Sequence, residues 1–315
     1  MTSILNPQGP AARALADIGW PVLLLFLAVT AVMWGLLAWL VVRRRGSYAD
    51  QVATSADGTG TQWILIGGFA IPAIVLALIF VATLGALKAF PVHEPDHREP
   101  QIRVIGHRWW WEIEYLYGGV HERVKSATEL HVPAGEPVDI ELVTRDVIHS
   151  FWVPELHGKV DLLPHMRTRI RIQADRPGIY RGKCAEFCGT QHTNMIFHVV
   201  AQEKEAFDAW LTRERQPAID PTSDAARQGA TVFATRACAL CHTVRGSGAN
   251  GLVGPDLTHF GSRRWIAGPM PNNEAYLRAW VTHAQSLKPG VVMPSIFDFT
   301  GEELHALTAY LRELK

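Results

Sequence analysis

The sequence has little charge and no excess of either sign. Its 315 residues include 30 Lys and Arg and 30 Asp and Glu, so the formal net charge is zero. A nucleic-acid-binding protein normally carries a basic excess that neutralises phosphates, and the balance argues against that class. Charged residues make up 19% of the chain, below the roughly 25% of soluble domains. We therefore expect part of the chain to lie in a membrane rather than to be disordered or wholly soluble.

Cysteine is also scarce. The first 183 residues contain none, and the four cysteines form two close pairs, Cys184 with Cys188 and Cys238 with Cys241. A histidine follows each pair, a pattern more typical of metal or cofactor attachment than of a disulfide framework.

Two long uncharged runs, residues 21–42 and 64–87, are predicted to cross a membrane as a two-helix hairpin within residues 1–95. A helix of 22 residues is about 33 Å long, enough for a hydrocarbon core of about 30 Å. Arg43, Arg44 and Arg45 directly follow the first run. The positive-inside rule then predicts a cytoplasmic connection and extracytoplasmic termini. The start of the chain lacks the features of a cleaved signal peptide, so we expect the first span to be retained.

Residues 96–216 show the pattern of a β domain. Apolar and polar residues alternate in residues 128–132, 138–143 and 169–173, and Pro-Gly turns separate these runs. About 100 residues of short strands predict a sandwich or barrel. A short helix is expected at the end, near residues 203–215.

The last part, residues 217–315, starts with a linker rich in proline and is predicted to be helical. Thr300 and Glu303 form a capping box before the final helix. Gly229 on the first helix of this part is expected to allow a close crossing with the final helix near Tyr310.

The first cluster of chemical groups lies in residues 184–195. Cys184, Cys188, His192 and Met195 bring together two thiols, an imidazole and a thioether, and His149 precedes them at a strand end. Soft sulfur ligands select copper, and two thiolates with one histidine for each ion predict a binuclear electron-transfer centre. A Cys2His2 zinc site and a redox disulfide remain alternatives.

The second cluster is the Cys-x-x-Cys-His motif of covalent haem attachment, Cys238, Cys241 and His242. The two thiols add to the haem vinyl groups, and the histidine is the proximal iron ligand. A thioredoxin-like pair or half a zinc site are the competing interpretations. A methionine as sixth ligand gives an electron carrier, and Met293 is favoured over Met270.

The motif Cys-x-Glu-x-Cys-x3-His-x2-Met resembles the CuA centre of subunit II of haem-copper cytochrome c oxidases, and the resemblance covers about residues 15–215. It implies a multi-domain membrane protein, with an all-β cupredoxin-like Greek-key barrel and an all-α class I cytochrome c domain fused behind it. The carboxylate of Glu186 is in addition a candidate ligand for magnesium shared with subunit I. The implied copper ligands are His149, Cys184, the backbone carbonyl of Glu186, Cys188, His192 and Met195.

The aromatic run at residues 106–112 resembles the aromatic stretch of the same family. The resemblance implies that Trp109 is the residue through which electrons enter, and a core or interface role is the alternative. Met293 resembles the distal methionine of class I cytochromes c. Residues 60–63 lack the carboxylate that many relatives use for proton uptake, so we make no prediction about a proton path.

The resemblance implies an electron-transfer subunit of a cytochrome c oxidase in a bacterial plasma membrane. Electrons pass from an external donor, a cytochrome c or a quinol-oxidising complex, through haem c and CuA to subunit I, which reduces oxygen to water with proton pumping. The alternatives are a subunit of a CuA-containing nitric-oxide reductase and a membrane-anchored copper-handling protein. A quinol-oxidase subunit is disfavoured, because that branch lacks the copper ligands. No nucleic-acid partner is expected.

Overall fold

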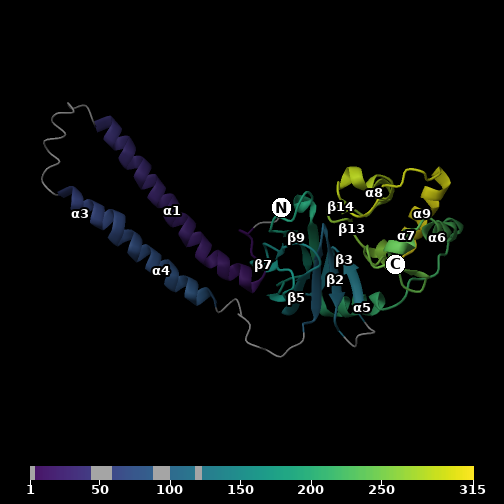
Figure 1. Cartoon of the computed structure of the whole chain (residues 1–315). Helices are drawn as coiled ribbons and strands as arrows, with labels where there is room; N and C mark the ends of the chain where they lie inside the picture. The colour runs from purple at the N-terminus through teal and green to yellow at the C-terminus, as the bar shows by residue number, and fades with distance from the viewer. Residues whose placement is uncertain (1–3, 44–58, 88–99, 118–122) are drawn as a thin grey trace. The chain divides into compact units, whose positions relative to one another are not determined.

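The computed structural model describes residues 4–43, 59–87, 100–117 and 123–315 (Figure 1). The chain divides into two compact units, one of residues 11–96 and one of residues 1–10 with 97–315. Arg44 and Arg45, on which the predicted orientation partly rests, lie outside the described residues, as does the expected boundary at residues 95 and 96.

The N-terminal unit contains the two apolar helices predicted from the sequence. The first, α1 (Pro10–Arg43), contains the run at residues 21–42 and extends beyond it toward the N-terminus, and the second is composed of α3 (Thr59–Leu65), a π-helical turn η2 (Ile66–Ala70) and α4 (Ile71–Ala86). Two stretches, Pro10–Arg43 of 34 residues and Gly60–Ala86 of 27, are long and apolar enough to cross a membrane. Pro72 lies in the first turn of α4, directly after the wider turn of η2, where the missing N–H is tolerated.

Two five-stranded sheets form the β domain, with strand orders β3-β2-β1-β5-β8 and β4-β10-β9-β6-β7. The pairs β1–β5 and β4–β10 are parallel, and the other neighbours are antiparallel. The strands are β1 (Ile102–His107), β2 (Trp110–Tyr115), β3 (Val124–Ala127), β4 (Glu129–Pro133), β5 (Val138–Thr144), β6 (His149–Trp152), β7 (Lys159–Leu162), β8 (Thr168–Ile172), β9 (Gly178–Cys184) and β10 (Ile196–Gln202).

The alternation seen in the sequence matches these strands, and the expected sandwich is confirmed. In β8, for example, Ile170 and Ile172 are buried while Arg171 between them is not. Trp111, Phe151 and Phe197 fill the centre of the core with ring centroids 4.6–6.0 Å apart. Trp111 extends this aromatic core to the neighbourhood of His149, whose ring lies 6.0 Å away.

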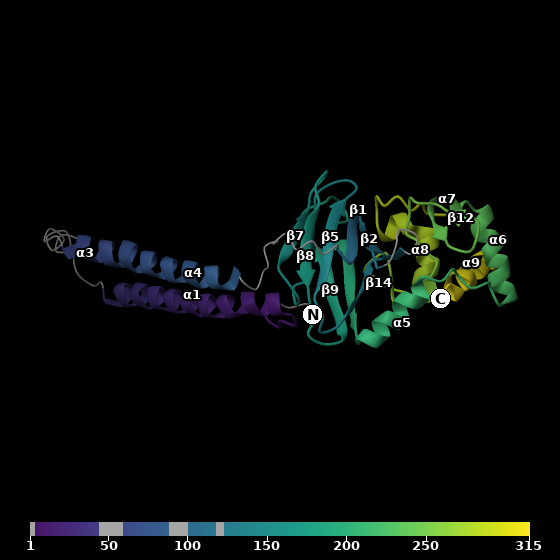
Figure 2. The same cartoon turned by 90° about the horizontal axis from the view of Figure 1, so that it is seen from below.

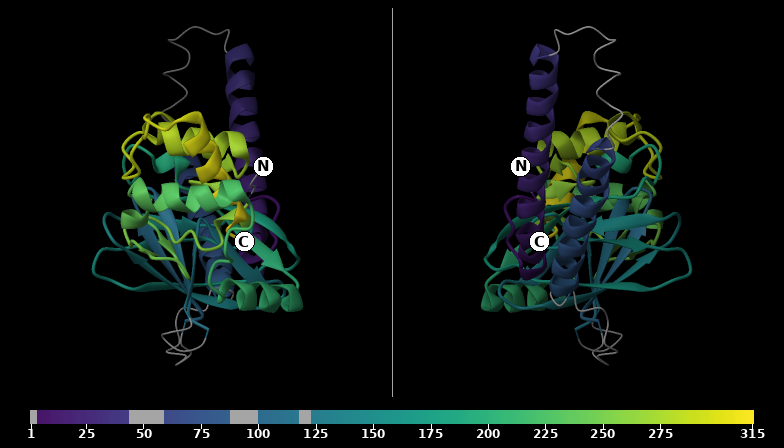
Figure 3. Two further views of the ribbon diagram at one scale, coloured as in Figure 1. Left: turned by 90° about the vertical axis from the view of Figure 1, so that its right-hand side faces the viewer. Right: turned by 90° about the vertical axis from the view of Figure 1, so that its left-hand side faces the viewer.

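The rest of the chain is mainly helical, as expected. Its first helix, α5 (Lys204–Glu214), packs against the sandwich, where Phe207, Trp210 and Leu211 join the core. The later helices, green to yellow in the figures, lie to one side of the strands (Figure 2) and so stand in front of them in the left view of Figure 3. Short two-residue strands and 3-10 turns connect the helices. The helices are α5 (Lys204–Glu214), α6 (Asp224–Thr235), α7 (Cys238–Cys241), α8 (Glu274–Leu287) and α9 (Gly301–Glu313). The short elements are η5 (His192–Asn194), β11 (Thr243–Val244), β12 (Ala249–Asn250), η6 (Phe260–Ser262), β13 (Trp265–Ile266) and β14 (Met270–Pro271).

Helices α6 and α9 cross closely at Gly229, as predicted. A Cβ atom on Gly229 would lie 2.0 Å from the carbonyl oxygen of Ala306, so only glycine permits this approach. Beside the crossing, the rings of Phe233 and Tyr310 meet edge to face at 5.6 Å. The capping box at Thr300, which starts α9, is also present.

The helical part is joined to the sandwich by buried polar contacts. The carboxylate of Glu129, on β4, accepts hydrogen bonds from the backbone N–H groups of Arg264 (2.6 Å) and Trp265 (2.9 Å). The Trp265 ring stacks on His198 of β10 with centroids 3.6 Å apart. These contacts fix one edge of the helical part against one sheet.

Candidate functional site

One half of the first cluster is centred on the Cys184 sulfur at the end of β9. Strand β6 lies beside β9 and carries His149 at its start. The Cys184 Sγ lies 3.8 Å from Nδ1 of His149 and 3.1 Å from the carbonyl oxygen of Glu186. A thiol, an imidazole nitrogen and a carbonyl oxygen therefore face one another.

The other half is centred on the Cys188 sulfur in the loop that follows. Cys188 Sγ lies 3.6 Å from Nδ1 of His192 and 3.8 Å from the thioether sulfur of Met195. The ligand atoms of His149, Cys184 and Cys188 all lie within 4.8 Å of one another, so the two halves adjoin. The structure thus brings together all six donor groups expected from the sequence.

Burial makes this cluster a site from which bulk water is largely excluded. His149 and Met195 are 0% exposed, and the two cysteines are 3% and 4% exposed. A hydrogen bond from the Cys188 thiol to the Cys184 sulfur lowers the pKa of Cys184 and raises that of Cys188. The pair therefore gives up a first proton readily, which favours binding of a cation by thiolate.

Neighbouring side chains orient the donors. A carboxylate oxygen of Asp146 lies 2.8 Å from Nε2 of His149, which leaves Nδ1 to face the sulfur. The indole N–H of Trp111 donates to the carbonyl of Met195 at 3.3 Å. Asp146 was not expected from the sequence, although its place three residues before a candidate histidine is a usable signal.

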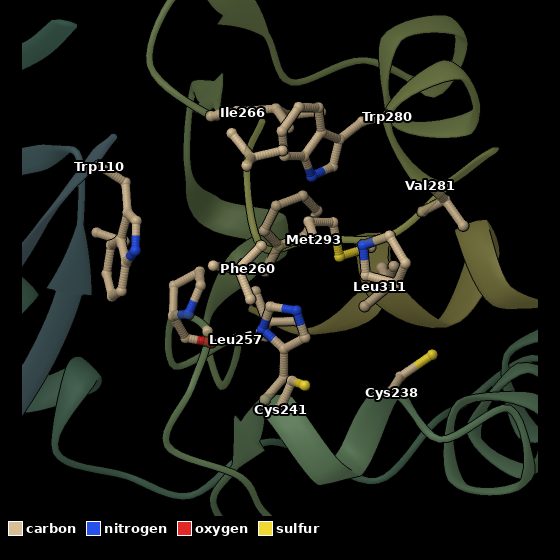
Figure 4. Close-up of a pocket in the computed structure, with 18 of the residues that line it drawn as sticks. Trp110, Cys238, Cys241, Leu257, Phe260, Ile266, Trp280, Val281, Met293 and Leu311 are labelled. Carbon is tan, nitrogen blue, oxygen red and sulfur yellow. Dashed lines mark hydrogen bonds between the residues drawn. The ribbon is translucent and has the colours of Figure 1, made fainter. Parts of the chain in front are cut away.

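The second cluster lies at a cavity of about 360 Å³ between the helical part and the sandwich. Cys238 and Cys241 lie at the two ends of α7, on one side of this cavity (Figure 4). The walls are mostly apolar and include Phe233, Leu257, Phe260, Trp280, Val281 and Leu311. An apolar cavity with two thiols at its edge fits a covalently attached macrocycle.

His242 follows α7 and presents one ring nitrogen to the cavity. Its Nδ1 donates a 2.8 Å hydrogen bond to the carbonyl of Pro255, so Nε2 is left for a metal. Burial lowers the pKa of His242, which favours the neutral imidazole that binds metals. A Cβ atom on Gly254 would lie 2.5 Å from the His242 ring, so glycine is needed there.

Of the two candidate methionines, Met293 lines the cavity and points into it (Figure 4). Its backbone carbonyl accepts a 2.7 Å hydrogen bond from the side chain of Gln285 on α8, which holds the loop. Met270 lies on β14, opposite Ile266, and is not among the residues that line the cavity.

Trp109 contacts both sites. It lines the cavity, and its indole N–H donates a 2.8 Å hydrogen bond to the carbonyl of Cys188. Trp110 also lines the cavity, where it stacks on His107 with centroids 4.4 Å apart (Figure 4). Lys288, which the sequence did not single out, lies at the same wall.

Comparison with known proteins agrees with this geometry. The family model for the periplasmic domain of cytochrome c oxidase subunit II matches residues 116–202, and that for cytochrome c matches residues 226–315. The cytochrome c oxidase subunit 2 of Alkalihalophilus pseudofirmus is 36% identical over 316 residues, which cover 99% of this chain and 90% of the relative. The chain belongs to the cytochrome c oxidase subunit II family.

Another relative, the cytochrome c oxidase subunit 2 of Bacillus sp. strain PS3, is 32% identical to this chain. The alignment covers 87% of this chain and 80% of the relative. The solved periplasmic domain of cytochrome oxidase subunit II of Bradyrhizobium japonicum aligns over 36% of this chain and 91% of its own, with 22% identity and a TM-score of 0.34.

Membership in the subunit II family gives this chain the role of an electron-transfer subunit of an oxidase, with other oxidase subunits as partners. The two matched domains imply copper and haem, and the apolar helices suggest a membrane anchor. The donor set fits copper because thiols, a thioether and imidazole nitrogens are ligands that soft metal ions prefer.

Proposed function

We propose that this chain accepts electrons for a haem-copper oxidase, with a binuclear CuA centre in the sandwich and a haem c in the helical part. One observation carries the proposal. Trp109 contacts the cluster of two cysteine-centred donor sets, and it also lines the apolar cavity that holds two thiols and a histidine. The proposed domains are residues 1–95, 96–216 and 217–315.

In the sandwich, two copper ions would be held by the six donor groups of His149, Cys184, the Glu186 carbonyl, Cys188, His192 and Met195. Sheet and loop hold these side chains in place before a metal binds, so little rearrangement is needed. The Glu186 carboxylate offers one hard oxygen ligand from this chain to a magnesium ion shared with subunit I.

In the helical part, Cys238 and Cys241 would bind the haem covalently. His242 and Met293 would bind the haem iron. The apolar walls exclude water, and a His–Met pair favours electron transfer over oxygen binding. The Nδ1 hydrogen bond to the Pro255 carbonyl fixes the ring orientation of His242.

When bound, haem c and the copper pair take up and release single electrons, the chemistry needed for a relay from an external donor, through haem and then copper, to subunit I. Trp109 would connect the two sites because it contacts the cavity and the carbonyl of a copper ligand. Reduction of oxygen and proton pumping belong to subunit I. Both sites and both termini would lie on the extracytoplasmic side of a bacterial plasma membrane.

Absorption spectra and metal analysis of the purified oxidase complex test the proposal. We expect haem c bands, a near-infrared mixed-valence band and two coppers per chain from this subunit. Cys184→Ser should abolish the near-infrared band and leave the haem c bands. Cys238→Ala should instead abolish the haem c bands and leave the near-infrared band. Zinc in place of copper, or noncovalent haem, would contradict the assignment.

A turnover assay separates the proposed relay from its alternatives. With an artificial reductant and no soluble cytochrome c, the complex should consume oxygen steadily, because the haem domain is part of the chain. Preference for nitric oxide over oxygen would instead indicate a nitric-oxide reductase. Ready loss of copper to a chelator during turnover would indicate a copper-handling protein.

A further inference from the structure

Lys288 is a buried lysine at the boundary between the haem cavity and the copper site. It caps the C-terminal end of α8, lines the cavity and is only 3% exposed. Its Nζ donates 2.7 Å hydrogen bonds to two backbone carbonyls, those of Trp109 and Ala267. One lysine therefore links a loop of the helical part to the strand connection that carries Trp109.

This arrangement is costly for stability alone. Among the described residues no carboxylate forms an ion pair with Lys288, and burial lowers its pKa to about 7. Burial of an amino group without an ion-paired carboxylate costs free energy that an apolar side chain would avoid. Both the ammonium and the neutral amine can donate to two carbonyls, so the contact with Trp109 persists in either state.

The two residues after Lys288 also lie against the sandwich. The carbonyl of Pro289 accepts a 3.0 Å hydrogen bond from the side chain of Gln191, in the copper loop. Gly290 has a φ of +87°, and a Cβ atom there would lie 3.4 Å from the Trp109 ring. Lys288 and Gly290 thus adjoin Trp109, while Pro289 is tied to the copper loop.

Trp109 is consequently held at two points, its carbonyl by Lys288 and its indole N–H by the Cys188 carbonyl. The first contact comes from the haem side and the second from the copper side. A residue held in this way, by its backbone on one side and by its indole on the other, stays in place between the two sites, because neither group can shift without losing a buried hydrogen bond.

We propose that Lys288 is a positioning residue that holds Trp109 between the haem cavity and the copper loop and thereby sets the rate of electron transfer between them. The inference rests on the proposed function. One electron leaves the reduced haem iron and reduces the copper pair by one, while Lys288 forms and breaks no covalent bond and keeps its proton count.

The test compares variants of the whole oxidase complex. Lys288→Met keeps the length of the side chain and removes its donors, and Lys288→Gln keeps two amide N–H donors without a charge. Glu129→Leu removes a different contact between the same two parts, the one from β4 to the backbone of Arg264 and Trp265. Lys204→Met is the matched control, because Lys204 is an exposed lysine on α5 that pairs with Asp208.

Two readouts are needed. The first is the rate of electron transfer from photoreduced haem to copper, measured in fully oxidised complex. The second, independent of activity, is hydrogen–deuterium exchange of the full chain in peptides that contain residues 106–112 and 285–292. Wild-type complex must first show the transfer, since its absence there would contradict the proposed function rather than the role of Lys288.

We expect Lys288→Met to slow the transfer by about tenfold or more, since small misplacements of reacting groups have effects of this size. Exchange in both peptides should rise, haem and copper spectra should stay unchanged, and Lys288→Gln should recover part of the rate. A Lys288→Met rate within twofold of that of Lys204→Met would overturn the proposal. Equal slowing by Glu129→Leu would overturn it too, because Lys288 would then be one docking contact among several.

Discussion

The indole nitrogen of Trp109 donates a 2.8 Å hydrogen bond to the backbone carbonyl of Cys188. Because Trp109 also lines the cavity beside α7, one side chain contacts both candidate redox sites. This relationship is specific to Trp109. Its neighbour Trp110 lines the cavity but stacks on His107, and Trp111 is buried in the core of the sandwich.

The first prediction concerns this pair of tryptophans. Trp109→Phe keeps an aromatic ring and removes the hydrogen bond to the Cys188 carbonyl, so haem-to-copper electron transfer should slow by about tenfold. Trp110→Phe, which leaves that hydrogen bond intact, should slow it much less. Transient absorption of the two centres after photoreduction measures both rates. Equal rates in the two variants would show that contact with Cys188 is irrelevant to the transfer.

A second prediction concerns the carboxylate that orients His149. Asp146→Asn replaces the 2.8 Å acceptor of His149 Nε2, so copper should dissociate more readily, with affinity reduced by about 10- to 100-fold. Titration of the purified complex with a copper chelator measures the loss. Asp139→Asn is the control, because Asp139 pairs with Arg171 on the same domain. If both variants retain copper like the wild type, Asp146 has no orienting role.

The two methionines give a third prediction. Met293→Leu removes the thioether that points into the cavity, and the haem potential should fall by on the order of 0.2 V, within the range that axial ligands set. The absorption feature of methionine-ligated ferric haem should vanish as well. Met270→Leu should leave both unchanged, because Met270 lies on β14. Redox titration followed by absorption decides between them, and the opposite pattern would reassign the ligand.

The fourth prediction is a dependence of stability on pH. Burial lowers the pKa of His198, which stacks on Trp265, to about 4 from a usual value of 6.5. Between pH 6.5 and 4 the unfolded chain therefore binds more protons than the folded chain, so stability falls as the pH is lowered through this window. Below about pH 4 both states are protonated and this contribution stays constant.

His198→Phe keeps a stacked ring and cannot titrate, so its melting temperature should fall less than that of the wild type over the same window. His305→Gln is the control, because His305 is exposed on α9. Thermal melts of the purified chain at several pH values provide the comparison. An unchanged pH profile in His198→Phe would mean that other groups govern the acid response.

The fifth prediction concerns the crossing of α6 and α9. Gly229→Ala would place a Cβ atom 2.0 Å from the Ala306 carbonyl oxygen and 2.7 Å from the Tyr310 Cβ. The helices would have to separate, at a cost of about 1–3 kcal/mol or more. Gly248→Ala, with no neighbour within 4 Å, should change the free energy of unfolding little. Chemical denaturation of the two variants measures the difference.

Much of the fold follows from local patterns in the sequence. The alternation at residues 138–143 and 169–173 predicted β5 and β8, because one face of a strand must be apolar to bury. The capping box at Thr300 predicted the start of α9 for an equally local reason. The first uncharged run, residues 21–42, lies within α1, which also takes in residues 10–20, where the sequence is less uniformly apolar.

Part of the candidate site could likewise be predicted from the sequence and part could not. The spacing of Cys184, Cys188 and their neighbours predicted a set of metal ligands, because residue type alone identifies thiols and imidazoles as donors. Asp146 and Lys288 escaped notice because a single Asp or Lys has no distinctive spacing. Their roles arise only where distant segments meet.

By itself the sequence determined which groups are available for metal and haem binding, and which segments are apolar enough to form helices and strands. The tertiary structure decided which histidine lies beside each cysteine sulfur, that Met293 and not Met270 lines the cavity, and that Trp109 contacts both sites. The physical reason is that ligand type is a property of single residues. Distance and burial, in contrast, depend on how strands and loops far apart in the chain pack together.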